Sequence, residues 1–187
     1  MAAALHRILK GATDVTNLDS HEALTKEQRQ TYMESLRFDQ IDARYATFKN
    51  AHVKTCRWLL KKSEYQDWLD TDKLPDHYGF LWVKGKPGTG KSTLMKFAVT
   101  NALNTMPDCI IISFFFNARG ETLEKSTSGM YRSLLLQLLE KLPEVQPVLD
   151  RFNRPLLQGT DEFNEWKIKT IKEIFQAAVR RLGKKKI

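Results

Sequence analysis

The pattern of hydrophobic and polar residues divides the chain near residue 75. Before this point the sequence is polar and rich in helix formers, and Gly11 is the only glycine before Gly79. The first ten residues resemble a short amphipathic helix, and the charged stretch 25–36 favours a longer one. From Ile41 onward, residues at helical spacing indicate a helix with one largely apolar face; they are Tyr45, Phe48, His52, Cys56, Leu59 and Leu60.

A second short helix is expected around Tyr65, Trp68 and Leu69. It should stop before the turn-like cluster at residues 74–77, where Pro75 biases the preceding residue towards extended geometry. The N-terminal part of the chain is therefore predicted to comprise a helical extension (1–35) and a helical linker segment (36–75).

After residue 78 the pattern changes to alternating strands and helices. The wholly apolar, β-favouring run 80–83 predicts a buried parallel strand, and the run 109–116 predicts a second one. Helices are expected over residues 92–103, 129–142 and 161–182, with an irregular segment at 144–160. The order strand–helix–strand–helix–helix predicts an α/β fold over residues 76–187.

Composition and charge narrow the classes of function. Apolar residues make up 42% of the 187 residues and charged residues 28%, which is ordinary for a soluble domain. No apolar run approaches the roughly 18 residues that a membrane span needs. Two cysteines, Cys56 and Cys109, cannot build a disulfide scaffold, so we expect a cytoplasmic protein.

The formal net charge of +8 suits an anionic partner. Nucleic acid is not favoured, because aromatic and basic residues do not interleave as in single-strand-binding platforms. The four histidines have no metal-binding spacing and are interpreted as structural or surface residues; they are His6, His21, His52 and His77.

One motif carries specific chemistry. It is a full match to G-x-x-x-x-G-K-[ST], the phosphate-binding loop or Walker A motif, and it lies between a predicted strand and a predicted helix. Its residues are Gly85, Lys86, Pro87, Gly88, Thr89, Gly90, Lys91 and Ser92, followed by Thr93. The alternative interpretation is a glycine-rich turn that only connects a strand to a helix.

Each part of the motif has a physical role in binding phosphate. The glycines allow backbone dihedrals that other residues avoid, so that the amides from about Gly88 to Ser92 can surround an anion. The positive end of the following helix adds to the same site. Lys91 is expected to contact the β and γ phosphates, and the Ser92 hydroxyl is expected to bind Mg²⁺. The predicted ligand is a nucleoside triphosphate with Mg²⁺.

Other candidate residues give weaker signals. Arg119 follows the second predicted strand at the edge where α/β sheets bind ligands, so it could reach a phosphate or a partner, although a solvated loop arginine is favoured. Asp108 and Ser113 are interpreted as strand-end residues, and Cys56 and Cys109 as inert. The basic residues 184–186 are interpreted as a solvated end of the chain.

The carboxylates for hydrolysis are missing from the sequence after the motif. Hydrolysis needs a further carboxylate near Mg²⁺ and a group that orients water. The run Ile110-Ile111-Ile112 is followed by Ser113 and phenylalanines rather than by Asp or Glu. We therefore assign no catalytic residue and expect no hydrolysis by this chain alone.

Residues 79–96 resemble the phosphate loop of fungal NACHT-type signalling NTPases with a nephrocystin-3-like N-terminal domain. The similarity extends to residues 37–44 and 55–60 upstream, and to residues 113–120 and 132–135 downstream. The resemblance implies a P-loop NTPase-type three-layer fold whose Walker B strand would begin about where this sequence stops. It also implies that the two predicted strands are not neighbours, so the sheet should be incomplete or paired differently from the family.

Two functions are compatible with these observations. The first is a nucleotide-binding module of a NACHT-type signal-transduction NTPase, with ATP favoured over GTP. The second is an interaction or decoy fragment that binds no nucleotide and associates with full-length NACHT relatives or with itself. A small-molecule kinase would need an arginine-rich lid and substrate carboxylates, which the sequence lacks.

Overall fold

The computed structural model describes residues 3–9, 23–39, 41, 45, 55–152 and 166–183. For the first of these ranges it describes only the backbone. The described elements are β1 (Ala3–Leu9), α1 (Lys26–Leu36), η1 (Arg57–Lys61), α3 (Ser63–Leu69), α4 (Leu74–His77), α5 (Lys91–Thr105), β2 (Cys109–Phe115), η2 (Leu123–Lys125), α6 (Thr127–Lys141), η3 (Pro143–Phe152) and α7 (Ile168–Gly183).

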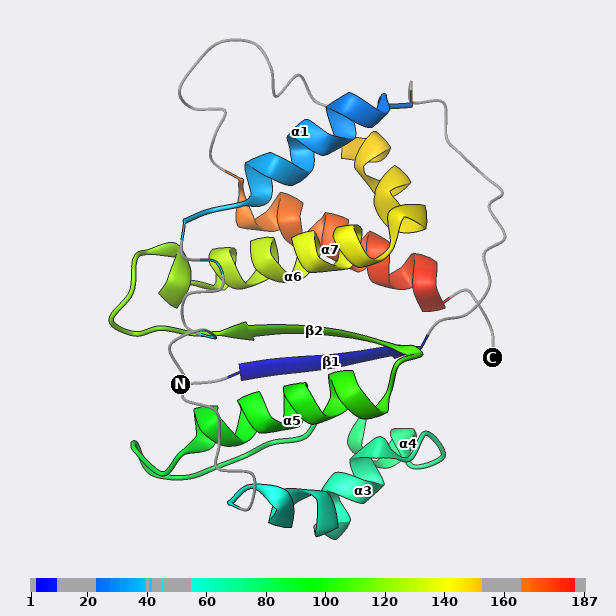
Figure 1. Ribbon diagram of the computed structural model, residues 1–187. Coiled ribbons are helices and arrows are strands. Elements are labelled where there is room, and N and C mark those ends of the chain that lie inside the picture. Colours follow the sequence, from blue (N-terminus) through cyan, green and yellow to red (C-terminus); the bar gives the residue numbers. More distant parts are fainter. Residues whose placement is uncertain are drawn as a thin grey trace.

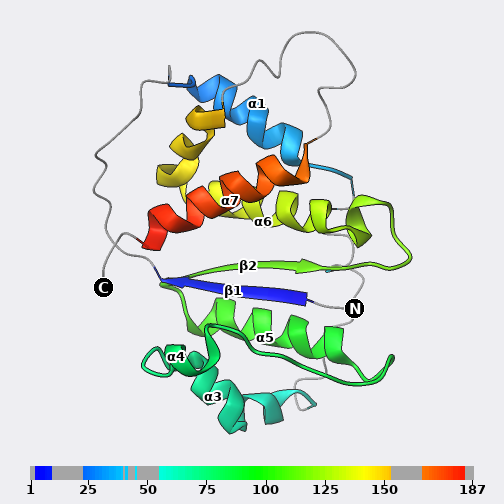
Figure 2. The same ribbon diagram turned by 180° about the vertical axis from the view of Figure 1, so that it is seen from behind.

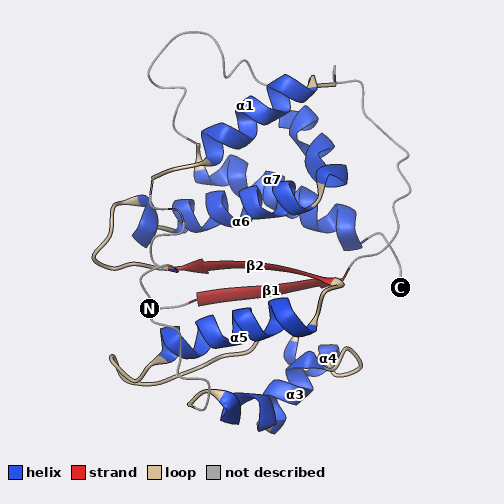
Figure 3. Ribbon diagram, viewed as in Figure 1, coloured by secondary structure: helices blue, strands red, loops and turns tan. Residues whose placement is uncertain are grey.

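Two strands form a sheet that lies between layers of helices. β1 and β2 pair antiparallel, with Ala3 opposite Phe115 and Leu9 opposite Cys109. Figure 1 and the reverse view in Figure 2 show α5 on one side of the strands and α1, α6 and α7 on the other. Figure 3 shows how far helices outweigh strands in this arrangement.

The side chains of β2 alternate between these two layers, as the pleat of a strand requires. Ile110, Ile112 and Phe114 belong to the large core that α1, α6, η3 and α7 build. Ile111 and Phe115 pack instead with Val99 and Ala102 of α5. Because both faces of β2 are covered, the strand sequence is apolar except at Ser113 rather than alternating, as the run of isoleucines and phenylalanines predicts.

A separate core joins η1 and α3 to the N-terminal half of α5. Its buried members include Cys56, Leu59, Tyr65 and Leu94. The half-buried Leu81 and Val83 pack against this core. The segment before the glycine-rich loop is therefore anchored beside the start of α5.

The helix predictions agree with most of the described residues. Helices predicted at 25–36, 92–103 and 129–142 correspond to α1, α5 and α6 within about two residues at each end. The last helix begins later than predicted, at Ile168, because residues 166–167 are not helical; residues 161–165 lie outside the described residues. Residues 42–44 and 46–54 of the predicted linker helix also lie outside them.

The prediction of a buried strand at residues 80–83 is wrong. This segment carries no strand assignment, and Phe80 is 80% exposed and Trp82 74% exposed. Only Leu81 and Val83 turn towards the core. A strand needs a neighbour for its backbone hydrogen bonds, and the described part of the chain places no strand beside this one.

The prediction of an N-terminal amphipathic helix is also wrong, because residues 3–9 form β1. β1 is the hydrogen-bonded partner of β2, so pairing between distant segments overrides local helix preference here. β2 thus pairs antiparallel with the N-terminal segment 3–9 and not with residues 80–83. That the sheet departs from the family pattern stays a prediction. The three-layer P-loop NTPase fold itself stays a prediction.

A glutamine side chain occupies the other edge of β2. The backbone amide of Ser113 donates to Gln137 Oε1 over 3.1 Å, and Gln137 Nε2 donates to the Ser113 carbonyl over 2.9 Å. Gln137 lies on α6 and its Nε2 also donates to Ser133 Oγ. The side chain therefore satisfies backbone groups that a further strand would otherwise pair.

Candidate functional site

The glycine-rich loop connects the extended segment after α4 to the start of α5. Gly90 is the N-cap of α5 with φ of 82°, and Gly88 has φ of 80°. Both values lie in the left-handed region that favours glycine, which explains why the motif needs glycine at these two positions. In both Figure 1 and Figure 2 the loop lies at the same end of the molecule as the C-terminal end of β2.

Lys91 folds back across the loop. Its Nζ donates to the carbonyl oxygens of Gly85 and Lys86, each over 2.7 Å. The Thr89 hydroxyl donates to the same Lys86 carbonyl over 2.9 Å. An ammonium group has three protons, so these two contacts fix the lysine against the loop and leave a third direction for an acceptor.

Close packing explains the glycine at the start of the loop. A Cβ atom at Gly85 would lie 2.9 Å from Thr89 Oγ1. That distance is shorter than real Cβ contacts, so a larger residue would displace the threonine hydroxyl from the Lys86 carbonyl. The first glycine of the motif is therefore needed for close approach.

A cavity of about 560 Å³ opens beside the loop and the first turn of α5. Its lining residues are Thr55, Cys56, Trp58, Val83, Lys84, Gly85, Thr89, Gly90, Lys91, Thr93 and Leu94. This volume lies within the roughly 300–1,000 Å³ of ordinary ligand pockets.

The structure brings five of the nine predicted phosphate-binding residues to this cavity. These are Gly85, Thr89, Gly90, Lys91 and Thr93. The other four do not line it, although they lie in the same loop and first turn; they are Lys86, Pro87, Gly88 and Ser92. Nothing in the geometry tests which of the nine contact a ligand, so their phosphate-binding roles stay a prediction.

The cavity is electropositive. Lys84 and Lys91 contribute cationic side chains, and the part of the chain that the structure describes adds no Asp or Glu to the lining. The first turn of α5 adds backbone N–H groups that have no acceptor within the helix, together with the positive end of the helix dipole. This arrangement can attract and hold an anion.

The weaker candidates lie elsewhere. Arg119 is exposed, its backbone amide donates to Asn117 Oδ1, and it does not line the cavity. Asp108 is exposed, and Ser113 bonds Gln137 at the edge of β2. These observations agree with the structural interpretation of all three residues.

The histidines and cysteines show no metal site within the described part of the chain. No group of three or more His, Cys, Asp or Glu residues is placed to hold a metal there. His77 Nδ1 accepts a hydrogen bond from the Gly79 amide over 3.0 Å, whereas the side chains of the other histidines lie outside the described residues. Cys56 and Cys109 are free thiols.

Sequence reasoning missed the part of the cavity that comes from the segment before α3. Thr55, Cys56 and Trp58 line the cavity although they precede the loop by about thirty residues in the sequence. The only signal was that residues 55–60 shared in the resemblance to NACHT-type proteins, and it did not indicate a place in the fold. The packing of Cys56 with Leu94 in one core is what brings them together.

Among the described helices, none is long and apolar enough to cross a membrane. This finding agrees with the absence of a long apolar run in the sequence.

Comparison with known proteins shows the family. The family described as Nephrocystin 3, N-terminal, matches residues 54–185, which is more than half of the chain. Vegetative incompatibility protein HET-E-1 from Podospora anserina is 25% identical over 130 residues, which are 67% of this chain. The chain spans only 9% of the length of that relative. No solved structure matches the chain.

The family match includes the whole glycine-rich loop, the cavity residues and the helices from α3 to α7. β1 and α1 lie before the matched region. The match confirms the resemblance that the sequence around the loop indicated: the chain belongs to the nephrocystin-3 N-terminal family, in its fungal NACHT-type form.

Proposed function

We propose that this chain is the nucleotide-binding module of a NACHT-type signalling NTPase, that it binds ATP in preference to GTP, and that it does not hydrolyse nucleotide by itself. The observation that carries the proposal is the electropositive cavity beside the loop, in which Lys91 is held by the Gly85 and Lys86 carbonyls. The name of the relative, a vegetative incompatibility protein, supports a signalling role. A cytoplasmic location is part of the same proposal, because two cysteines cannot build a disulfide scaffold.

In this proposal the loop and the first turn of α5 hold the triphosphate. Lys91 would direct its ammonium group at the β and γ phosphates, and the amides at the start of α5 would donate to phosphate oxygens. The lysine already points across the loop, so little reorganisation is needed. A phosphate oxygen can accept a hydrogen bond from the third N–H of the Lys91 ammonium group, or replace one of the two carbonyls as an acceptor.

Mg²⁺ would enter with the nucleotide. Ser92 lies in the first turn of α5 and is half-buried, so its hydroxyl could be one oxygen ligand. No carboxylate of the described residues lines the cavity, and phosphate oxygens and water would have to supply the other ligands. Mg²⁺ commonly binds in this way, because it keeps several of its waters. The residues present therefore fit a metal that is bound as a nucleotide complex.

The first experiment is a titration with a fluorescent ATP analogue in the presence of Mg²⁺. Lys91→Ala should weaken binding by about ten- to a hundredfold, because it removes charge-assisted contacts. Lys86→Ala is the matched control: it removes the same charge from an exposed side chain of the same loop that does not line the cavity, and should change the affinity much less. Equal affinities of the wild-type and Lys91→Ala proteins would refute the site.

The absence of hydrolysis has its own test. Hydrolysis needs a carboxylate near Mg²⁺ and the attacking water, and within the described ranges of the chain none lines the cavity. The ATPase rate of the purified chain should equal that of Lys91→Ala. A wild-type turnover of even about 1 per second that the variant loses would show that the chain is a complete enzyme.

The second candidate is an interaction module that binds no nucleotide and associates with NACHT relatives or with itself. The favouring observation is the group of exposed aromatic side chains just before the loop, namely Tyr78, Phe80 and Trp82. Exposed apolar patches of this kind often mark protein contacts. The titration separates the candidates, because this function predicts no saturable binding of ATP by either the wild type or Lys91→Ala.

A further inference from the structure

The lining of the cavity beside the loop includes an aromatic residue that phosphate binding does not use. This residue is Trp58 of η1, which is 51% exposed and lines the same cavity as Lys91 and Gly85. Leu59, the next residue along η1, is buried in the core that also contains Leu94 of α5. The backbone that carries Trp58 is thus fixed against the same helix that begins at Lys91.

The lining of the cavity combines two kinds of chemistry. Lys91, Lys84 and the backbone of the loop suit phosphate groups. The indole ring of Trp58 is an aromatic surface in the same lining. A nucleotide combines the same two kinds of chemistry, a charged phosphate chain and a flat aromatic base.

We propose that Trp58 is the base-binding residue of this site, and that the indole ring stacks on the base of the nucleotide whose phosphates the loop holds. This inference rests on the proposed function. Stacking on an aromatic side chain tolerates every base, because each base has a π face. The ring would therefore add affinity for nucleotides over free phosphate, while the choice between ATP and GTP would come from polar groups.

The exposure of Trp58 also fits this role. A tryptophan that served only packing would be buried, as Trp68 of α3 is at 7% exposed. Trp82 is exposed too, at 74%, but does not line the cavity. The chain therefore contains its own matched control, an exposed tryptophan near the same loop with no predicted contact to the base.

The test compares two ligands that share the phosphate chain, namely ATP and inorganic tripolyphosphate, by calorimetry with Mg²⁺. Trp58→Ala should weaken ATP binding about tenfold and leave tripolyphosphate binding unchanged. Trp82→Ala should change neither affinity, and Lys91→Ala should weaken both. Trp58→Phe keeps an aromatic ring and should retain most of the ATP affinity.

Fluorescence gives a second measurement that does not depend on the alanine variant folding. ATP should quench the tryptophan emission of the wild type, and should quench the emission of the Trp58→Phe variant much less. Tripolyphosphate should quench the emission of neither protein. The base contact would be overturned, and the phosphate site left in place, by either of two results. One is an equal loss of affinity for ATP and tripolyphosphate in Trp58→Ala; the other is an equal affinity of the wild type for these two ligands. Failure of the wild type to bind either ligand would refute the proposed function as well.

Discussion

At the scale of single residues, the hydroxyl of Tyr65 is the least satisfied polar group of the core that joins η1 and α3 to α5. Tyr65 is 1% exposed and packs against Trp68, with ring centroids 5.8 Å apart. Its hydroxyl is buried without a hydrogen-bond partner in the described part of the chain. Burying an unpaired hydroxyl costs free energy, whereas the ring itself contributes through apolar burial.

Tyr65→Phe should therefore stabilise the protein by about 1 kcal/mol, because it removes the unpaired hydroxyl and keeps the ring. The measurement is the free energy of unfolding in urea at neutral pH. Tyr78→Phe, which alters a side chain that is 79% exposed, is the control and should have little effect. A clear loss of stability in Tyr65→Phe would mean that the hydroxyl has a partner after all.

Alkaline pH should destabilise the protein through the same residue. Burial raises the pKa of Tyr65 above its ordinary value, and burial also raises the pKa of Tyr32. Well below about pH 10 both phenols are neutral in the folded and unfolded states, so their contribution to the free energy of unfolding is fully present. As the pH rises towards the raised folded-state values, only the unfolded chain loses these protons, and the free energy of unfolding falls.

Urea unfolding at about pH 8 and about pH 10.5 would measure this loss. Tyr65→Phe should lose less stability between the two pH values than the wild type does, and Tyr32→Phe should behave in the same way. An identical pH dependence in the wild type and both variants would exclude tyrosine ionisation as the cause.

At the scale of elements, polar side chains join segments that are distant in sequence. The Arg132 guanidinium on α6 donates to the carbonyls of Ser35, Leu36 and Arg37, which end α1. Burial lowers the pKa of this guanidinium below its ordinary value, although the group remains charged at any physiological pH. Arg132 thus satisfies carbonyls that the last turn of α1 leaves without helical partners.

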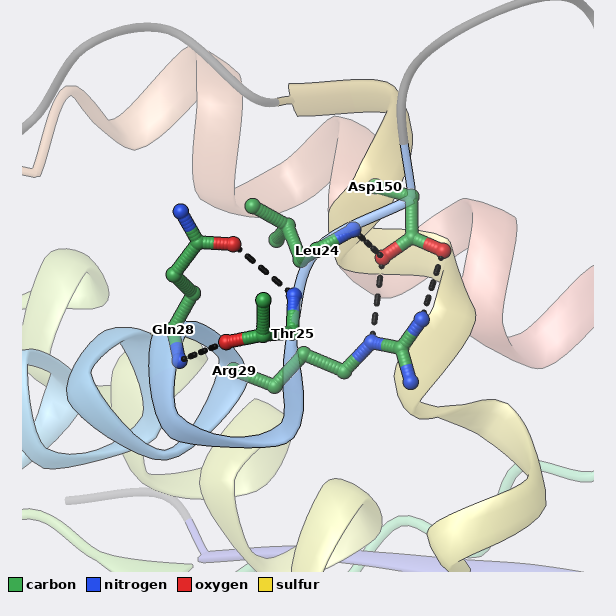
Figure 4. A network of polar contacts seen from close by, with 5 residues as sticks. All are labelled: Leu24, Thr25, Gln28, Arg29 and Asp150. Atoms are coloured by element: carbon green, nitrogen blue, oxygen red, sulfur yellow. Dashed lines mark hydrogen bonds and ion pairs between the residues drawn. The ribbon is translucent and has the colours of Figure 1, made fainter.

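A buried ion pair joins the start of α1 to η3. Figure 4 shows that Asp150 accepts two hydrogen bonds from Arg29, at 3.0 Å from Nε and 2.8 Å from an Nη atom. The Leu24 amide also donates to this carboxylate, and Asp150 is only 2% exposed. Thr25 and Gln28 form a capping box at the same helix start. Sequence reasoning missed Asp150, because 121 residues separate it from Arg29.

Arg29→Leu should destabilise the protein by about 3 kcal/mol, because it leaves the Asp150 carboxylate buried without its cation. The exposed pair of Arg37 with Glu140 provides the control: Glu140→Gln should cost less than about 1 kcal/mol. The measurement is again unfolding in urea. Similar small effects of both changes would show that Asp150 is solvated in solution.

At the scale of the whole molecule, the extended segment before the loop is the most exposed apolar part of the described chain. Phe80 and Trp82 point outward while Leu81 and Val83 pack inward, so the segment has the alternation of a strand without a paired neighbour. An unpaired extended segment with aromatic side chains is a surface on which chains associate. We expect the purified protein to self-associate through it.

Light scattering over a concentration series would test this expectation. The wild type should gain mass as concentration rises, and the double change Phe80→Ser with Trp82→Ser should keep the chain monomeric. Replacing Ile168, an exposed apolar residue at the start of α7, by Ser is the control and should not prevent association. A wild-type chain that stays monomeric throughout would contradict the prediction.

The sequence alone determined those features whose signals are local. The motif from Gly85 to Ser92 specified a loop with left-handed glycines followed by a helix, because phosphate-loop chemistry needs those residues at that spacing. Helix-favouring composition and helical periodicity located α1, α5 and α6, and the apolar run 109–116 located β2. The same local similarity predicted the family that the comparisons show.

Only the tertiary structure decided which strands exist and what surrounds the loop. The runs at 80–83 and 109–116 look alike in sequence, but only the second has a hydrogen-bonded neighbour, in β1. Likewise, Trp58 reaches the cavity only because its segment packs on α5. Strand pairing and burial depend on distant segments, and their free energy is absent from any short stretch of sequence.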